Sequence, residues 1–114
     1  MSTMPIDFGD VVLAPFPFTN QVAFKQRPAV VVSSRAYNTD RPDVVIMPIT
    51  SQLGSATGKG DVLISEWRQA NLLKPSAVKP VFATLEQRLI IRRLGILQAQ
   101  DQSALHTAIA SVLG

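Results

Sequence analysis

The sequence predicts a mainly β fold of the α+β class: a small curled sheet or barrel with short helices and a C-terminal helix packed on it. Short apolar runs of strand length recur along the chain and are bounded by turn residues. One amphipathic stripe at helical spacing lies near the C-terminus. A regular alternation of strand and helix is absent, which disfavours a parallel sheet built from βαβ units.

Three strands are expected in the first half of the chain. Proline cannot join a central ladder, so Pro15 and Pro17 are expected to lead the chain out of the first strand and into a polar loop that ends at Gln26. Between the second and third strands, residues 38–42 are turn formers and predict a plain turn. The apolar runs that predict the strands are residues 11–14, 29–33 and 44–49.

The second half begins with short strands around a short helix. Residues 61–64 predict a fourth strand, and Ser65 is expected to cap a short helix after it. Residues 77–84 predict another strand. Pro80 interrupts this run, which indicates an edge strand or a bulge.

Two further helices are expected toward the C-terminus. The capping-box spacing of residues 84–87 predicts a short helix that ends at Gly95. Asp101 is expected to start the last helix, which should pack its apolar stripe on the sheet. That stripe consists of Leu105, Ile109, Val112 and Leu113.

Composition limits the class of protein. The 114 residues are expected to form one domain, 1–114, and 46% apolar with 17% charged residues indicates a globular chain. No apolar run has membrane-spanning length and the N-terminus lacks signal-peptide features, so a cytoplasmic protein without a membrane partner is expected. The absence of cysteine excludes disulfides and thiolate chemistry. The net charge of +3 comes from scattered basic residues, which favours a shaped, moderately basic groove for a polyanion.

Histidine and metal chemistry are disfavoured. The only histidine, His106, lies at the border of the apolar stripe of the last helix, an ordinary place for a surface histidine, so a Ser-His-Asp triad is not expected. The eight carboxylates are dispersed along the chain and do not assemble the several oxygen ligands that a Mg²⁺ nuclease needs. No metal and no other cofactor is therefore expected.

Polar groups at the ends of two strands predict an anion-binding patch. Arg27 comes directly before the second strand, and Thr50, Ser51 and Gln52 follow the third. If these strands pair antiparallel, the start of one lies beside the end of the other. Arginine offers a phosphate two planar donors, so Arg27, with Lys25 nearby, is interpreted as phosphate-binding rather than as a solvent-facing charge. The hydroxyls either end the strand or bind phosphate oxygens.

Aromatic residues accompany this patch. Phe18 and Phe24 lie in the loop before Arg27, together with Asn20. Each phenylalanine either joins the core or stacks on a nucleobase, as in proteins that bind single strands. Trp67 is interpreted as a core anchor.

At these residues the chain resembles the MazF/PemK family of bacterial toxins. Four segments carry the resemblance in the family's order, and together they cover most of the chain at matching spacing. They are the opening at residues 9–12, the arginine-proline strand at 25–33, the threonine motif at 49–52 and a late strand-helix-strand segment at 85–97. Each segment alone is weakly specific, whereas the combination is fairly specific.

The resemblance implies an SH3-like barrel that forms a homodimer and acts as a metal-independent, sequence-specific endoribonuclease on single-stranded mRNA. It implies a cognate antitoxin whose acidic, disordered tail occupies the RNA groove, with operator DNA bound only through the antitoxin complex. Arg27 matches the family's catalytic arginine and Thr50 its catalytic threonine. The expected RNA-binding residues are Phe18, Asn20, Phe24, Lys25, Ser51, Gln52 and Lys79.

Two departures from the family pattern keep other functions open. Residues 19–24 lack the glycine and acidic residues common there, and Lys79, Pro80, Phe82 and Ala83 replace late-strand residues that many members share. Either a contact in the RNA groove is lost through these departures, or Lys79 replaces it. One alternative is a toxin of the same fold that poisons a protein target such as DNA gyrase through its C-terminal helix. Another is a catalytically inactive member that binds only its antitoxin or operator DNA.

Overall fold

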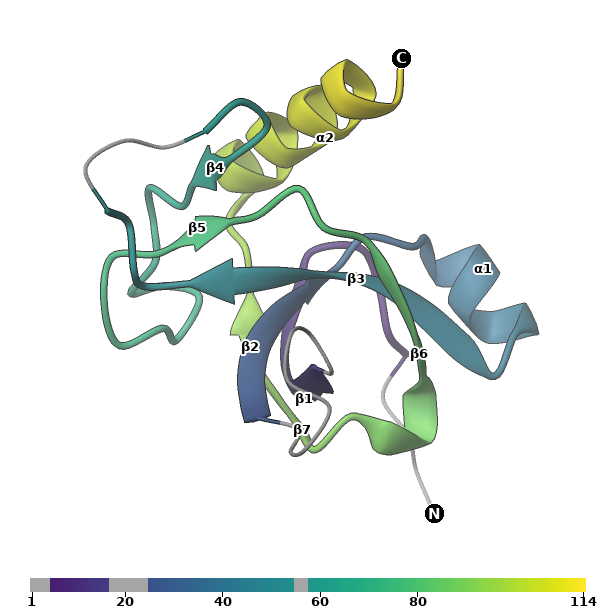
Figure 1. Cartoon of the computed structure of the whole chain (residues 1–114). Coiled ribbons are helices and arrows are strands. Elements are labelled where there is room, and N and C mark those ends of the chain that lie inside the picture. Colours follow the sequence, from purple (N-terminus) through teal and green to yellow (C-terminus); the bar gives the residue numbers. More distant parts are fainter. Residues whose placement is uncertain (1–4, 17–24, 55–57) are drawn as a thin grey trace.

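The computed structural model describes residues 5–16, 25–54 and 58–114. A mainly antiparallel sheet curls into a half-barrel, and the C-terminal helix lies at one end of it (Figure 1). The predicted fold class is confirmed. In chain order the elements are β1 (Asp10–Phe16), β2 (Lys25–Val31), α1 (Arg35–Asp40), β3 (Asp43–Thr50), β4 (Val62–Leu63), β5 (Ala77–Val78), β6 (Ala83–Glu86), the 3₁₀ turn η1 (Gln87–Leu89), β7 (Arg92–Ile96) and α2 (Ala99–Leu113).

The sheet is organised around β3. Ile46 has partners on both edges of this strand, Val31 of β2 on one and Ala83 of β6 on the other. Further along, β3 pairs with β5, and β4 completes that end of the sheet. Between the β5 and β6 pairings, residues 79–82 stand opposite only two residues of β3, Met47 and Pro48. The interruption predicted at Pro80 is thus a bulge.

Alternate residues of the paired strands face two separate cores. Val11 and Val30 lie opposite each other and belong to a cluster to which α2 contributes Leu105. The next pair, Val12 and Ala29, belongs to a second cluster on the other face of the strands. Burial on both faces explains why these strands read as continuous apolar runs rather than as an alternating pattern.

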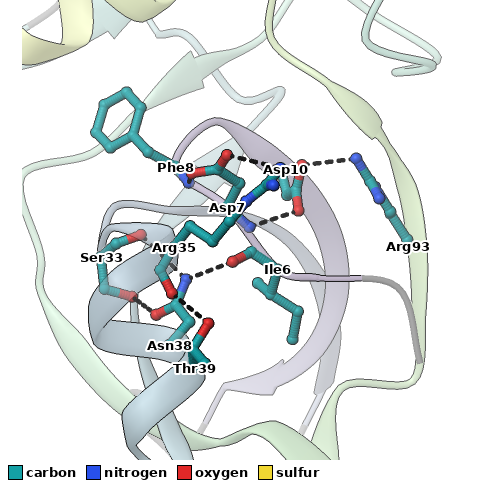
Figure 2. A network of polar contacts seen from close by, with 9 residues as sticks. All are labelled: Ile6, Asp7, Phe8, Asp10, Ser33, Arg35, Asn38, Thr39 and Arg93. Atoms are coloured by element: carbon teal, nitrogen blue, oxygen red, sulfur yellow. Dashed lines mark hydrogen bonds and ion pairs between the residues drawn. The ribbon is translucent and has the colours of Figure 1, made fainter.

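Helix α1 ends with residues 38–40, which the sequence predicted as the first part of a plain turn. The Ser34 hydroxyl accepts a hydrogen bond from the Tyr37 N–H at 3.1 Å and caps the helix. Asn38 is buried, and its Nδ2 donates to the Ile6 carbonyl at 2.8 Å (Figure 2). A helix of six residues is too short to reveal its periodicity, and contacts remote in sequence hold it in place.

The helix predicted to end at Gly95 is also wrong. Residues 83–86 form β6, in which Ala83 and Leu85 pack against the second core while Thr84 and Glu86 are exposed. Pairing with β3 therefore decides this segment against its capping-box spacing. Gly95 lies inside β7, where the carbonyl oxygen of Ala70 is 2.6 Å from the position that a Cβ would take. The late strand-helix-strand order implied by the family resemblance is present as β6, η1 and β7.

Smaller boundaries also differ from expectation. β2 begins at Lys25 and ends at Val31, so Gln26 and Arg27 lie in the strand and not in a loop before it, because they continue the pairing with β1. β1 continues through Pro15 and Phe16, because its register with β7 ends at Leu13 while that with β2 continues. The segment after Ser65 forms turns rather than a capped helix. α2 begins at Ala99 rather than at Asp101.

The turn after β4 is capped from α2 instead. Asp101 is buried, and its two carboxylate oxygens accept the Ser65 and Glu66 N–H groups at 2.8 and 2.9 Å. Along the predicted stripe of α2, Leu105 is fully buried, but Val112 and Leu113 are 43% and 67% exposed. Within the described residues, no helix is long and apolar enough to cross a bilayer.

A polar network ties the N-terminal segment to α1 and β7 (Figure 2). Asp10 is buried; its Oδ2 accepts the Asp7 N–H at 2.9 Å and its Oδ1 accepts Nη2 of Arg93 at 2.8 Å. Burial raises the pKa of the Asp10 carboxyl, although the Asp7 N–H and the Arg93 charge oppose this shift. Asp7 also pairs with Arg35 at 3.2 Å. In this region charges are neutralised by one another.

Candidate active site

Arg27 and Thr50 meet where β2 begins and β3 ends. The two strands are antiparallel, as the sequence reasoning required, and Ala29 stands opposite Pro48. Continuing this register by two residues on each strand places Arg27 opposite Thr50. The half-buried state of both residues leaves part of each side chain accessible.

An open cavity of about 430 Å³, here called the large cavity, adjoins this pair. Its lining includes the four residues that the sequence placed together, Arg27, Thr50, Ser51 and Gln52. The rest of its wall comes from β1, from further residues of β2 and β3, from residues 71–76 and from β7. The polar lining residues that the sequence analysis did not single out are Gln26, Asn71, Lys74, Ser76 and Arg92.

The large cavity is electropositive. Among the described residues that line it, three are cations, Arg27, Lys74 and Arg92, and none is a carboxylate. The ion pairs that the described residues form do not include any of these three side chains. Unneutralised positive charge in a concave surface attracts anions and concentrates them there.

A second hollow of about 220 Å³, the small cavity, adjoins the same pair. It is lined by Arg27, Pro48, Ile49, Thr50, Lys79 and Val81. Arg27, Ile49 and Thr50 line both cavities, and we call these three residues the shared wall. Lys79 therefore lines the same hollow as Arg27 and Thr50.

The Lys79 ammonium is held by a buried carboxylate. Its Nζ donates to Oδ2 of Asp61 at 2.7 Å, and the Asp61 side chain is only 3% exposed. The same oxygen accepts the Gly58 N–H at 2.7 Å. The hydrogen bond from Lys79 holds the pKa of the Asp61 carboxyl below its ordinary value, although burial alone would raise it.

The Thr50 hydroxyl can both accept and donate a hydrogen bond, and its role as an acceptor is seen in the structure. Its Oγ1 accepts a hydrogen bond from the Gln52 N–H at 3.0 Å, which turns the chain at the end of β3. A hydroxyl that accepts one hydrogen bond still carries an O–H donor. The two interpretations weighed for this residue, a strand end and an anion contact, are therefore compatible.

The remaining residues of interest lie elsewhere. Phe18, Asn20 and Phe24 lie outside the described residues, and Lys25 is placed only as the first residue of β2, opposite Phe16. His106 is exposed, and its ring stacks on Phe8 with the ring centroids 4.0 Å apart. It is not among the described residues that line either cavity. In the described part of the chain, no three histidine or carboxylate side chains gather as they would around a metal ion.

Trp67 is half-buried and packs against the first core, in the anchoring place expected for it. Its exposed side carries the Arg68 guanidinium 4.4 Å from the ring centre.

The residues missed by sequence reasoning had weak signals. Arg92 and Arg93 are adjacent, and on a strand adjacent side chains face opposite sides. Arg93 pairs with Asp10, whereas Arg92 lines the large cavity. This assignment required β7 to be recognised as a strand. Asn71 adopts a positive φ of 63°, and its Nδ2 donates to the Leu94 carbonyl at 2.7 Å, so a turn of unusual shape positions this wall.

Comparison with known proteins gives a family and a fold. The sequence model of the family described as "PemK-like, MazF-like toxin of type II toxin-antitoxin system" matches residues 7–113. A search of curated protein sequences finds no match. The fold is shared with a crystal structure of MazE-MazF from Deinococcus radiodurans, with a TM-score of 0.77, 22% identity and 98% of each chain covered.

Two mycobacterial structures share the same fold. An endoribonuclease in complex with its cognate antitoxin has a TM-score of 0.74 and 20% identity, covering 98% of this chain and 96% of that one. A MazF toxin from Mycobacterium tuberculosis has a TM-score of 0.71 and 21% identity, covering 91% of this chain and 95% of that one.

Proposed function

This chain belongs to the PemK-like, MazF-like toxin family of type II toxin–antitoxin systems, and we propose that it is a toxin that cleaves single-stranded mRNA at a specific sequence without a metal ion. The observation that carries the proposal is the large cavity beside Arg27 and Thr50, whose described lining has three cations and no carboxylate. A nucleic-acid backbone is the abundant polyanion that such a surface suits.

The proposed reaction uses the RNA's own nucleophile. The oxygen of a 2′-hydroxyl attacks the adjacent phosphorus while the bond from phosphorus to the 5′-oxygen breaks. The 2′-hydroxyl gives up its proton and the departing 5′-oxygen gains one, so the products are a 2′,3′-cyclic phosphate and a 5′-hydroxyl. DNA lacks the 2′-hydroxyl and is not cut.

Arg27 and Thr50 stabilise the charge that this reaction develops. Negative charge grows on the phosphoryl oxygens in the transition state, and fixed donors aimed at those oxygens lower the barrier. Arg27 donates two planar hydrogen bonds and stays protonated at neutral pH. Thr50 contributes its remaining O–H donor to a phosphoryl oxygen or to the 2′-hydroxyl. Lys25, Ser51, Gln52 and Lys79 bind the strand on either side, with Phe18, Asn20 and Phe24 from the preceding loop.

The direct test is incubation of the purified protein with a long single-stranded RNA in EDTA, beside a DNA of the same sequence. We expect discrete cuts in RNA only, with cyclic-phosphate ends. Arg27→Ala should reduce the cleavage rate by about 100- to 1,000-fold, the usual effect of removing one preorganised donor. Arg88→Ala is the matched control, because Arg88 is exposed and pairs with Glu86 away from both cavities.

The other outcomes discriminate between functions. Cleavage that requires Mg²⁺, or equal cleavage by Arg27→Ala, would contradict the proposed mechanism. No cleavage at high protein concentration would favour a toxin with a protein target, or an inactive member that binds only its antitoxin.

Two partners belong to the same proposal. In the cytoplasm, the acidic, disordered tail of a cognate antitoxin would compete with RNA for the cationic cavity, and operator DNA would be bound only through that complex. A homodimer would cover the end of α2, where Val112 and Leu113 are exposed. Light scattering that gives a monomer mass at all concentrations would remove the homodimer.

A further inference from the structure

The cations of the site are distributed over the two cavities that meet at the shared wall. Lys74 and Arg92 line the large cavity, Lys79 lines the small cavity, and Arg27 lines both. A single strand whose cleaved phosphate lies at Arg27 and Thr50 must continue in both directions. Because both cavities adjoin these residues, we expect the backbone on either side of that phosphate to meet the cations of the two cavities.

Lys79 differs from the other cations because its ammonium is anchored. Asp61 accepts its Nζ hydrogen bond from a buried position, and the Gly58 N–H fixes the same carboxylate oxygen. The backbone of Lys79 is also fixed, since its N–H donates to the Pro48 carbonyl at 3.0 Å. Both ends of a long side chain are thus held, which removes much of the rotamer freedom that binding would otherwise cost.

Asp61 lines a different hollow, one formed with residues of β4 and α2. Asp61 is absent from the described lining of the small cavity, whereas Lys79 is part of it and 42% exposed. An ammonium has three donors and Asp61 takes one, so two remain for an anion that enters from the cavity side.

We propose that Asp61 is a positioning residue that holds the Lys79 ammonium where it binds the RNA phosphate next to the one at Arg27 and Thr50. This inference rests on the proposed ribonuclease activity and adds a second phosphate site to it. Fixing the neighbouring phosphate aligns the 2′-oxygen, the phosphorus and the departing 5′-oxygen, so the site acts on the cleavage step as well as on binding.

The first experiment measures the salt dependence of binding. The probe is a fluorescent single-stranded RNA with a 2′-deoxynucleotide at the mapped cleavage site, which binds without being cut. Each phosphate contact on a single strand contributes about 0.7 to the slope of log affinity against log salt concentration. Lys79→Met should reduce the slope by about this amount. Lys59→Met should leave it unchanged, because Lys59 is an exposed lysine in the adjoining turn and lines neither cavity.

The second experiment is a double-mutant cycle on kcat/KM for RNA cleavage. We expect Asp61→Asn and Lys79→Met each to lower kcat/KM by about tenfold, and the double variant to be no worse than Lys79→Met alone, because residues that act as one unit are not additive. Asp61→Glu keeps the charge but displaces the ammonium, so it should lower kcat/KM similarly and serves if Asp61→Asn does not fold.

Each other result has a definite meaning. Equal losses from Asp61→Asn with and without Lys79 would show that Asp61 only supports the chain locally, which overturns the inference. Tighter RNA binding by Asp61→Asn in both backgrounds would show that it merely repels phosphate, with the same consequence. An unchanged salt slope in Lys79→Met, in a protein that cuts RNA, overturns the inference alone. A native protein that neither binds nor cuts RNA overturns the proposed function with it.

Discussion

Arg92 and Arg93 are neighbours on β7, yet they belong to two regions with opposite electrostatics. Arg93 reaches the buried Asp10 and completes the network that joins the N-terminal segment, α1 and β7 (Figure 2). Arg92 lines the large cavity, where the described lining contains no carboxylate. Because successive side chains on a strand point to opposite faces, these two adjacent arginines reach different surroundings.

Arg93 represents cations that stabilise the fold, whereas Arg92 represents cations that are available to a ligand. A buried carboxylate needs its partner, since an uncompensated charge in the interior is costly. A cation in an open cavity remains hydrated and can exchange water for phosphate at little cost. Lys79 combines both conditions, because it is paired with the buried Asp61 and still partly exposed.

After Arg27→Ala, the largest effect on cleavage is expected from a change at Thr50, which lines the large cavity. Thr50→Val should lower the rate of RNA cleavage by about 100-fold, because it removes a donor from the shared wall, while Thr50→Ser should retain most of the activity. Gel-based rates with a defined RNA measure this, and thermal unfolding checks that both variants are folded. Equal activity of the valine and serine variants would mean that the hydroxyl only ends β3.

At Arg93, which pairs with Asp10, we expect a loss of stability without a loss of cleavage. Arg93→Met should lower the free energy of unfolding by about 2 kcal/mol, because it removes the cation that pairs with the buried Asp10 carboxylate. Cleavage per folded molecule should remain close to that of the native protein. Urea unfolding gives the first quantity, and activity at a temperature where the variant is folded gives the second.

The effect of Arg93→Met should also depend on pH. Burial raises the pKa of Asp10 above 3.8, so the folded protein binds this proton more tightly than the unfolded chain does. Arg93 stabilises only the ionised carboxylate, so the cost of removing it is greatest at neutral pH and shrinks as the pH falls through this raised pKa. A cost that stays constant from pH 7 to pH 4 would show that Arg93 acts through packing instead.

Gly95 lies on β7, the strand that carries both arginines, and the carbonyl of Ala70 packs against it. Residues that follow Ala70, from Asn71 to Ser76, line the large cavity. Gly95→Ala should lower the free energy of unfolding by about 1–2 kcal/mol, as a methyl group cannot fit 2.6 Å from a carbonyl oxygen. Gly58→Ala is the matched control, since the nearest atom to its new Cβ would be at an ordinary 3.7 Å. Equal stability of the two variants would show that the turn at Ala70 yields freely.

The smallest effect is expected at Arg92. Arg92→Met should reduce the salt slope of RNA binding by about 0.7 and leave the free energy of unfolding unchanged, the opposite of Arg93→Met. Fluorescence anisotropy over a series of KCl concentrations measures the slope. A loss of stability with no change in slope would place Arg92 among the structural cations and end the comparison.

Part of this architecture could be predicted from the sequence because its signals lie close together along the chain. The runs before and after Arg27 and Thr50 are apolar and of strand length, and their polar ends met as antiparallel pairing requires. Pro80 marked the break between β5 and β6, because it cannot donate to the ladder. The order of motifs also indicated the family.

Other elements could not be predicted because their signals are remote in sequence. α1 depends on Asn38 bonding to Ile6, and the turn after β4 is capped by Asp101 of α2. Residues 84–87 carry a local helix signal that strand pairing overrides. Arg92 and Lys74 could join the candidate site only after β7 and residues 71–76 were placed around the cavity.

The strands that carry Arg27 and Thr50, the break at Pro80 and membership of a toxin family follow from residue types at short spacing, so they can be read from the chain alone. Which charges are neutralised depends instead on how the chain folds. Asp10 finds Arg93 across 83 residues and Asp61 finds Lys79 across 18, while Arg27 and Arg92 gain no such partner among the described residues. The physical reason is that charge pairing acts over a few ångströms in space, and only the fold sets those distances.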